Sequence, residues 1–201
     1  MSSDSYRTVA GESQHEPPKT KGSRFIATVA PISEAGEITA LVERLRGTFP
    51  TANHHGYAYR LGRDRDHFRY SDDGEPSGSA GRPILRQIDG RDLTDTAVVV
   101  SRIFGGTKLG VGGLIRAYGG AAAEALDRAE IRELVPLRRV RLTYPYDLEG
   151  PIDGLIGAAG LVPVEASYGE SIVKTLEIPE ADAAGFLADL VERTSGRVTI
   201  D

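Results

Sequence analysis

The segment IFGGTKLGVGGLIRAYGG, residues 103–120, combines many glycines with two cations, Lys108 and Arg116. Glycine inside regular structure is disfavoured by about 0.5–1 kcal/mol relative to alanine, so such a run indicates backbone that adopts positive φ or closely approaches another group. The segment joins an apolar, strand-like stretch to a helix-like one, and backbone N–H groups at a helix N-terminus attract anions. Tight packing of a turn against a sheet explains the same glycines, and the spacing leaves both interpretations open.

If the loop binds an anion, we expect its ligands to be nearby cations, glycine amides and two aromatic residues of an earlier strand. These residues are Arg102, Gly105, Gly106, Lys108, Gly110, Gly112, Arg116, His54 and Tyr57. Lys108 would supply a point charge and Arg116 a bidentate fork. If His54 and Tyr57 lie on the same face, they would stack on a base or form hydrogen bonds with it. The loop is not a Walker A motif, because Thr107 precedes the lysine instead of following it.

A second segment, YSDDGEPSGSAGRP at residues 70–83, gathers three carboxylates, Asp72, Asp73 and Glu75. They could ligate Mg²⁺ or share a proton. Asp-Gly and Glu-Pro are also common turn sequences, and acidic residues stabilise a following helix N-terminus. We favour the turn, and therefore expect no metal, no cofactor and no catalytic residue. Motifs of serine hydrolases and zinc proteases are absent, so the sequence gives little support to a hydrolase.

Composition restricts the class of protein further. The chain has 201 residues, 40% of them hydrophobic, and no cysteine, which excludes disulfides and thiolate metal sites. No segment resembles a signal peptide or a membrane span, so we expect a cytoplasmic protein with no membrane partner. Residues 1–135 carry equal numbers of acidic and basic side chains, whereas residues 136–201 hold 6 Lys and Arg against 11 Asp and Glu. The acidic balance argues against indiscriminate nucleic-acid binding but permits one local basic face.

The hydrophobic pattern predicts an α+β protein. Residues 1–22 are polar and are expected to be a flexible tail. Residues 23–135 contain the two glycine-containing loops among alternating strands and helices, including a helix over 33–49 with Ser33 as a possible N-cap. Their last helix is expected to run from Gly113 to Leu134. After a linker near Val135, residues 136–201 show the order β-α-β-β-α-β, which is typical of a ferredoxin-like domain.

The two loop motifs together resemble the IMPACT family, also called the YigZ family. The stretches SDDGEPSGSAGRPIL and FGGTKLGVGGLIRAY, with SRFIA and HHGYAYRLG, carry this resemblance over roughly residues 20–130. It implies an N-terminal domain with the fold of domain 2 of ribosomal protein S5, and a C-terminal domain similar to a translation elongation factor module. Three residues depart from the family pattern: Ser79 replaces an expected Thr, Gly56 often corresponds to Cys, and Asn53 alters the approach to His54. The missing Cys puts thiol chemistry at that position in doubt.

We therefore expect a non-enzymatic, translation-associated regulatory protein that contacts RNA, the ribosome or a translation factor through its glycine-rich loops. The alternative is an enzyme for a small phosphorylated substrate or nucleotide, in which Asp72 or Asp73 holds Mg²⁺ or acts as a base and Lys108 neutralises the phosphate. This alternative depends on analogy with small-molecule kinases of similar fold. A third interpretation makes the loops an apolar surface for a protein partner.

Overall fold

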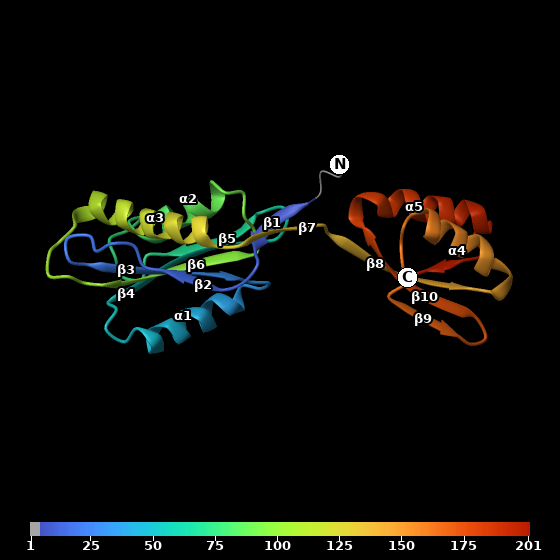
Figure 1. Cartoon of the computed structure of the whole chain (residues 1–201), viewed down its shortest axis with the longest axis horizontal. Coiled ribbons are helices and arrows are strands. Elements are labelled where there is room, and N and C mark those ends of the chain that lie inside the picture. Colours follow the sequence, from blue (N-terminus) through green and yellow to red (C-terminus); the bar gives the residue numbers. More distant parts are fainter. Residues whose placement is uncertain (1–4) are drawn as a thin grey trace. The chain divides into compact units, whose positions relative to one another are not determined.

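The computed structural model of the protein describes residues 5–201, which divide into two compact units (Figure 1). Residues 6–134 form the N-terminal unit, and residues 135–201, together with Ser5, form the C-terminal unit. Each unit has hydrophobic clusters of its own. Within the described residues, no helix combines the length and apolar character that crossing a bilayer requires.

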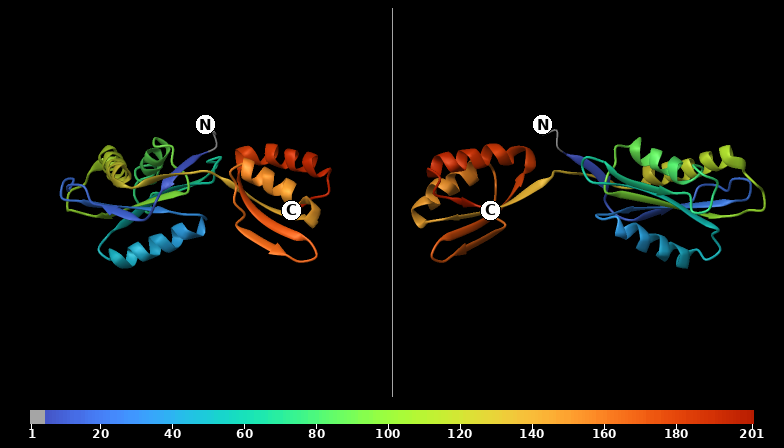
Figure 2. Two further views of the ribbon diagram at one scale, coloured as in Figure 1. Left: turned by 45° about the vertical axis from the view of Figure 1, so that its right-hand side comes forward. Right: turned by 180° about the vertical axis from the view of Figure 1, so that it is seen from behind.

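The N-terminal unit is a five-stranded antiparallel sheet between two layers of helices (Figures 1 and 2). The strand order is β2-β3-β6-β4-β5, with α2 and α3 on one face and α1 on the other. Its elements are β1 (Tyr6–Val9), β2 (Ser13–His15), β3 (Arg24–Pro31), α1 (Gly36–Thr48), β4 (His54–Leu61), β5 (His67–Ser71), α2 (Gly81–Asp89), β6 (Thr96–Ile103), α3 (Gly110–Arg128) and β7 (Ile131–Leu134).

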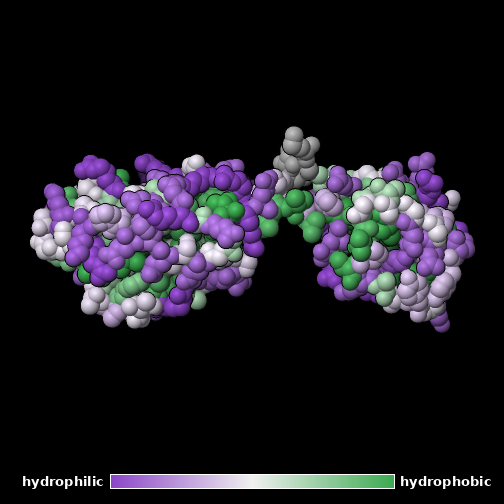
Figure 3. Space-filling model, in the orientation of Figure 1, coloured by the Kyte–Doolittle hydropathy of each residue, from purple (hydrophilic) through white to green (hydrophobic). Residues whose placement is uncertain are grey.

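Strand β6 lies at the centre of this sheet and is buried on both faces. Its unbroken apolar sequence suits this position. Val98 and Val100 pack with α2 and α3, whereas Ala97 and Val99 pack with α1. Such a continuous apolar run is expected of a strand covered on two sides. Hydrophilic residues dominate the face of this unit seen in Figure 3, as expected when amphipathic helices form the outer layers.

The expectation of a flexible tail over residues 1–22 is wrong for the described part that forms strands. β1 pairs antiparallel with β7, and β2 pairs antiparallel with β3. Val9 is fully buried, so one apolar side chain and two strand pairings order a segment whose composition is polar. Residues 1–4 of the expected tail lie outside the described residues.

Two expectations about helix ends also differ from the structure. The helix expected to reach Leu134 ends at Arg128, because Ala129 is extended and the following residues form β7. Ser33 does not cap α1; instead, its hydroxyl donates to Glu37 Oε1 at 2.6 Å, and no side chain caps the helix at Ala35.

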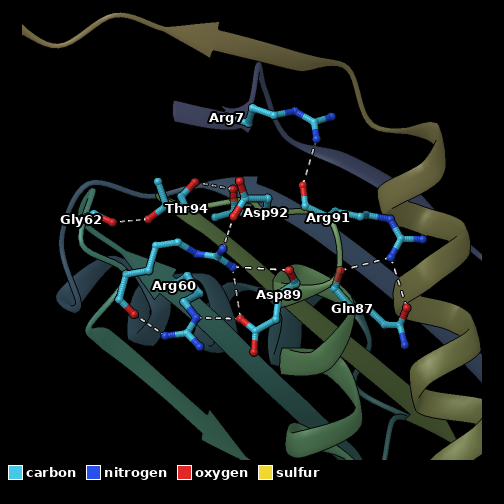
Figure 4. A network of polar contacts seen from close by, with 10 residues as sticks. Arg7, Arg60, Gly62, Gln87, Asp89, Arg91, Asp92 and Thr94 are labelled. Atoms are coloured by element: carbon cyan, nitrogen blue, oxygen red, sulfur yellow. Dashed lines mark hydrogen bonds and ion pairs between the residues drawn. The ribbon is translucent and has the colours of Figure 1, made fainter. Parts of the chain in front are cut away.

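A polar network closes one end of the N-terminal unit (Figure 4). Arg60 Nε donates to Asp89 Oδ1 at 2.6 Å, and Arg7 Nη1 donates to the Arg91 carbonyl at 3.1 Å. These contacts join β4, the end of α2 and β1. Arg60 pairs with Thr96 at the start of β6. The network therefore lies at the opposite end of that strand from the glycine-rich loop, and we assign it a structural role.

The C-terminal unit is a four-stranded antiparallel sheet of order β11-β8-β10-β9 with two helices. Leu142, Ile172 and Leu176 of the sheet are buried together with Ile152 and Leu190 of the helices. The βαββαβ order is ferredoxin-like, so the expected α+β fold class is confirmed. Its elements are β8 (Leu137–Tyr144), a short 3₁₀ turn (Tyr146–Leu148), α4 (Glu149–Ala158), β9 (Glu165–Tyr168), β10 (Ile172–Pro179), α5 (Glu180–Thr194) and β11 (Thr199–Ile200).

Candidate functional site

The glycine-rich loop connects β6 to α3, and three of its glycines are required by the backbone. Gly106 and Gly110 have φ values of +87° and +68°, a region that residues with a Cβ rarely adopt. A Cβ on Gly105 would lie 1.9 Å from the carbonyl carbon of Gly22. Gly112 has no such requirement, because a Cβ there would meet only Arg116 Nη1, at 3.8 Å.

The loop leads directly into α3, and no described side chain caps the N-terminus of this helix. Leu109 precedes the helix in a right-handed helical conformation, and no side chain accepts a hydrogen bond from the N–H groups of the first turn. These groups carry the positive end of the helix dipole. Lys108 is exposed beside them and makes no ion pair with a described residue. This end of α3 is therefore positively charged and open.

A cavity of about 370 Å³ lies between this helix end and the acidic loop that follows β5. Glu75 comes from the acidic loop, and Lys108 comes from the glycine-rich loop, so the structure brings the two predicted motifs to one pocket. Four polar side chains are set among apolar walls. The lining residues are His54, Glu75, Pro76, Arg102, Phe104, Lys108, Leu109, Gly110, Val111 and Leu114.

A buried polar cluster forms the inner wall of this pocket. Glu75 Oε1 accepts hydrogen bonds from Arg102 Nη1 and from Tyr118 Oη, both at 2.7 Å. The side chains of Arg102 and Glu75 are only 7% and 3% exposed. Burial raises the pKa of the Tyr118 hydroxyl, and the hydrogen bond to Glu75 raises it further, so the phenol remains a proton donor.

Arg102 is held in this wall by two aromatic rings as well as by Glu75. The centre of its guanidinium lies 5.7 Å from the Phe25 ring centroid and 5.6 Å from that of Phe104. Both separations are within the range of cation–π attraction. Asn53 Oδ1 accepts a hydrogen bond from the Phe104 backbone N–H at 3.0 Å and so positions that residue at the mouth of the pocket. Arg102 lines the pocket and is paired there with Glu75.

The alternation of β4 separates the two aromatic residues that we expected to act together. His54 faces the pocket, and its Nδ1 donates to the Asp73 carbonyl at 2.8 Å, which leaves Nε2 4.0 Å from Glu75 Oε1. Tyr57 packs against the cluster under α1, on the other face of the sheet. Residues three apart in a strand lie on opposite faces. The expectation that Tyr57 shares a site with His54 is therefore wrong.

His55 is a buried neighbour of the site. Its Nδ1 lies 2.8 Å from Ser101 Oγ, on the opposite face of the sheet from His54. Burial lowers the pKa of His55, and the Arg46 charge lowers it further. A neutral His55 therefore has a structural role between β4 and β6.

Asp72 and Asp73 hold the acidic loop in place. The Asp72 carboxylate accepts the N–H groups of Gly78, Ala80 and Gly81 at 2.7, 2.9 and 2.9 Å. The Asp73 carboxylate accepts from Arg46 Nη2 and from the His55 N–H, each at 2.6 Å. Both act as turn residues, which is the interpretation that the sequence favours. Residues 5–201 contain no cluster of three or more His, Asp or Glu side chains arranged to hold a metal ion.

Arg116 lies outside the pocket, in a neighbouring hollow of about 200 Å³. Leu109 lines both cavities and separates them. The hollow also contains Lys21, which has a φ of 45° and makes no ion pair with a described residue. Sequence reasoning missed Lys21 because it assigned that residue to a flexible tail. The available signal was the sequence KTKG immediately before the first expected strand of the domain.

Comparison with known proteins identifies the family. Residues 21–126 match the Impact N-terminal domain, and residues 142–197 match a domain of unknown function, DUF1949. The chain belongs to the IMPACT family. The resemblance carried by the two loop motifs is thus confirmed, and membership supports a regulatory, translation-related role in general.

Similar IMPACT proteins cover nearly the whole chain. An IMPACT family member in the pol 5′ region of Thermus thermophilus is 41% identical over 180 residues, covering 89% of this chain and 97% of that protein. The family member YvyE of Bacillus subtilis is 34% identical over 197 residues, covering 98% and 90%. YigZ of Escherichia coli is 34% identical over 182 residues, covering 90% and 89%. A crystal structure of a hypothetical protein matches with a TM-score of 0.71 at 32% identity, covering 98% of this chain and 96% of that one.

Two departures of this IMPACT protein from the family pattern have structural explanations. A Cβ on Gly56 would lie 2.9 Å from the Ala80 Cβ and 3.3 Å from Tyr118 Cε1, so the glycine lets β4 pack closely against α2 and α3. Ser79 keeps the hydroxyl of the expected Thr and donates it to the Pro76 carbonyl at 2.6 Å. Neither residue takes part in thiol chemistry.

Proposed function

We propose that this IMPACT protein is a translation-associated regulatory protein that binds RNA, including RNA of the ribosome, through its N-terminal unit. The observation that carries this proposal is the pocket at which the acidic and glycine-rich loops meet. The uncapped N-terminus of α3 and the unpaired Lys108 attract phosphate there, while the apolar walls suit an unstacked base.

Local charge supports the proposal more than total charge does. The chain as a whole carries a net charge of −5. Three cations nevertheless border the two cavities that flank Leu109: Lys21, Lys108 and Arg116. None of the three makes an ion pair with a described residue. Phosphate contacts of this kind give an affinity that falls as salt increases.

Replacing Lys108 tests the proposal directly. Lys108→Glu reverses the charge at the helix N-terminus, and we expect it to weaken RNA binding by about 10-fold or more at low salt. Because Lys108 is exposed and unpaired, the melting temperature should change little. Binding is measured by fluorescence anisotropy with single-stranded RNA and by sedimentation with ribosomes through sucrose at low and moderate salt.

A charge reversal elsewhere in the same unit is the matched control. Arg69 is exposed on β5, paired with Tyr59 in the sheet, and its face is the one covered by α1 rather than by α3. Arg69→Glu should leave binding unchanged. Equal losses in both variants would show a general charge effect, and an absence of RNA binding by the native protein would rule out the proposal.

A small-molecule enzyme is the second candidate, favoured by the presence of Glu75 and His54 Nε2 in one pocket. The carboxylates of Asp72 and Asp73, which this alternative assigned to Mg²⁺ or to a base, are bound to protein donors instead. Calorimetric titration with a nucleotide, with and without Mg²⁺, distinguishes the candidates. Tight binding that requires Mg²⁺ would favour the enzyme.

A further inference from the structure

The Glu75 carboxylate has unused hydrogen-bonding capacity inside the pocket. A carboxylate offers about four acceptor positions, two on each oxygen. The Arg102 guanidinium and the Tyr118 hydroxyl occupy those of Oε1. Oε2 accepts no hydrogen bond from a described residue, although the side chain is 3% exposed and lines the cavity. Oε2 is not one of the fully buried polar atoms of the described residues, so it is open to the cavity and can accept hydrogen bonds from a ligand that brings donors.

The charges around Glu75 restrict the kind of ligand group that fits. A phosphate in the interior would face the carboxylate oxygen, and an ammonium group would face Arg102 and Lys108. A neutral group that donates two hydrogen bonds avoids both repulsions. The walls formed by Phe104, Leu109 and Leu114 favour a flat apolar surface on that group.

We infer that the pocket binds a guanine base, whose N1–H and N2–H donate to Glu75 Oε2. Guanine presents two adjacent donors on its Watson–Crick edge. Adenine and cytosine present one donor beside an acceptor, and uracil presents one donor between two acceptors. The Phe104 ring is 45% exposed at the mouth of the pocket and stacks on the base. This inference rests on the proposed RNA-binding function and names the nucleotide that the site prefers.

The surroundings of the pocket provide for the phosphates of that nucleotide. Lys108 and the first N–H groups of α3 border the cavity that receives the base. Beyond Leu109, Lys21 and Arg116 border the second hollow, one side chain away. An RNA strand would place its base in the first cavity and a neighbouring phosphate in the second. A free guanosine nucleotide would use only the first.

The base series on the unmodified protein is the primary test. Short uridine RNAs with one central guanosine, inosine or adenosine are compared by fluorescence anisotropy. We expect guanosine to bind about 10-fold or more tightly than adenosine. Inosine lacks the N2 amino group and so loses one donor, which should place its affinity between the two. Equal affinities for all three RNAs would overturn the inference while leaving RNA binding intact.

Two variants separate base recognition from stacking. Glu75→Gln keeps the size of the side chain but replaces an acceptor oxygen, and we expect it to remove the preference for guanosine over adenosine. Phe104→Leu should weaken binding of all three RNAs about 10-fold and keep the preference. Thermal unfolding checks the fold of Glu75→Gln. If this variant is unfolded, the base series still decides. A Glu75→Gln protein that folds and retains the preference would overturn the inference.

Competition by GMP and AMP distinguishes RNA from a free nucleotide. GMP should displace the guanosine RNA at a concentration about 10-fold lower than AMP. Preferential GMP binding by a protein that binds no RNA would support the guanine site and contradict the proposed function. Equal displacement by both nucleotides would contradict the guanine site.

Discussion

Asp72, Asp73 and Glu75 are close neighbours in the chain, yet their carboxylates contact entirely different partners. Asp73 and Gly74 have φ values of 45° and 85°, which reverse the chain between the second and third acid. Asp72 consequently binds backbone N–H groups at the start of α2, while Glu75 enters the wall of the pocket. The chemistry of each carboxylate is thus determined by the direction of the backbone at its position.

The Arg102–Glu75 pair at the pocket is buried, so loss of either partner destabilises the fold. Removing one partner of a buried ion pair costs about 3–5 kcal/mol because the remaining charge is left without compensation. This cost explains why the Glu75→Gln test needs a check of folding. The change from Glu to Gln retains one oxygen that Arg102 and Tyr118 can share.

At the residue scale, we predict opposite effects for two glycines of the same loop. In Gly105→Ala the new Cβ would lie 1.9 Å from the carbonyl carbon of Gly22, so the two backbones must separate. We expect the free energy of unfolding to fall by about 1–3 kcal/mol. In Gly112→Ala the helical position is open, and stability should rise by up to about 1 kcal/mol. Urea unfolding of both variants measures the difference, and similar losses in both would contradict the close approach.

At the scale of elements, the N-terminus of α2 is stabilised by a residue that lies outside the helix. The helix begins after Ala80, and no side chain of its own first turn caps it. The Asp72 carboxylate, eight residues earlier, accepts the N–H groups of Ala80 and Gly81 instead. Hydrogen bonds therefore join the acidic loop to the first residues of α2.

Replacing Asp72 should consequently destabilise α2. We expect Asp72→Ala to lower the free energy of unfolding by about 1–2 kcal/mol, as the loss of an N-cap does. Hydrogen exchange of the Gly81 amide should become faster. Asp66→Ala removes an exposed carboxylate from the neighbouring hairpin turn and is the control. If the two variants are equally stable, the Asp72 carboxylate does not stabilise the N-terminus of α2.

At the scale of the whole molecule, the hydrophobic clusters divide cleanly between the two units. Buried residues of the described chain form two clusters within the N-terminal unit and one within the C-terminal unit. A unit with its own core is expected to fold by itself. The two units should therefore unfold independently.

We predict that a fragment of residues 5–134 folds cooperatively and retains the RNA affinity of the full chain. A fragment of residues 135–201 should also fold, but should not reproduce the preference for guanosine. Circular dichroism during thermal unfolding and anisotropy with the same RNAs measure both properties. Loss of binding in the first fragment, despite a cooperative transition, would show that the C-terminal unit takes part in recognition.

Most of the local structure could be predicted from the sequence. The apolar run of β6 and the periodicity of the helices identify elements because burial imposes a pattern on neighbouring residues. The order of elements in residues 136–201 was sufficient to predict the ferredoxin-like fold. The two loop motifs were sufficient to identify the family. Alternation along β4 would also have separated His54 from Tyr57.

The composition of the site was decided only by the tertiary structure. Contacts between distant segments, such as Gly22 with Gly105 and Glu75 with Tyr118, depend on strand order and on the sign of φ at a few turns. Pairing with β7 and β3 likewise orders a polar segment as β1 and β2, and Lys21 and Arg116 line the same hollow. The sequence by itself therefore determined the elements and the family, because both leave local patterns. Packing across the sheet determined which residues share a pocket, because that packing joins segments with no local pattern in common.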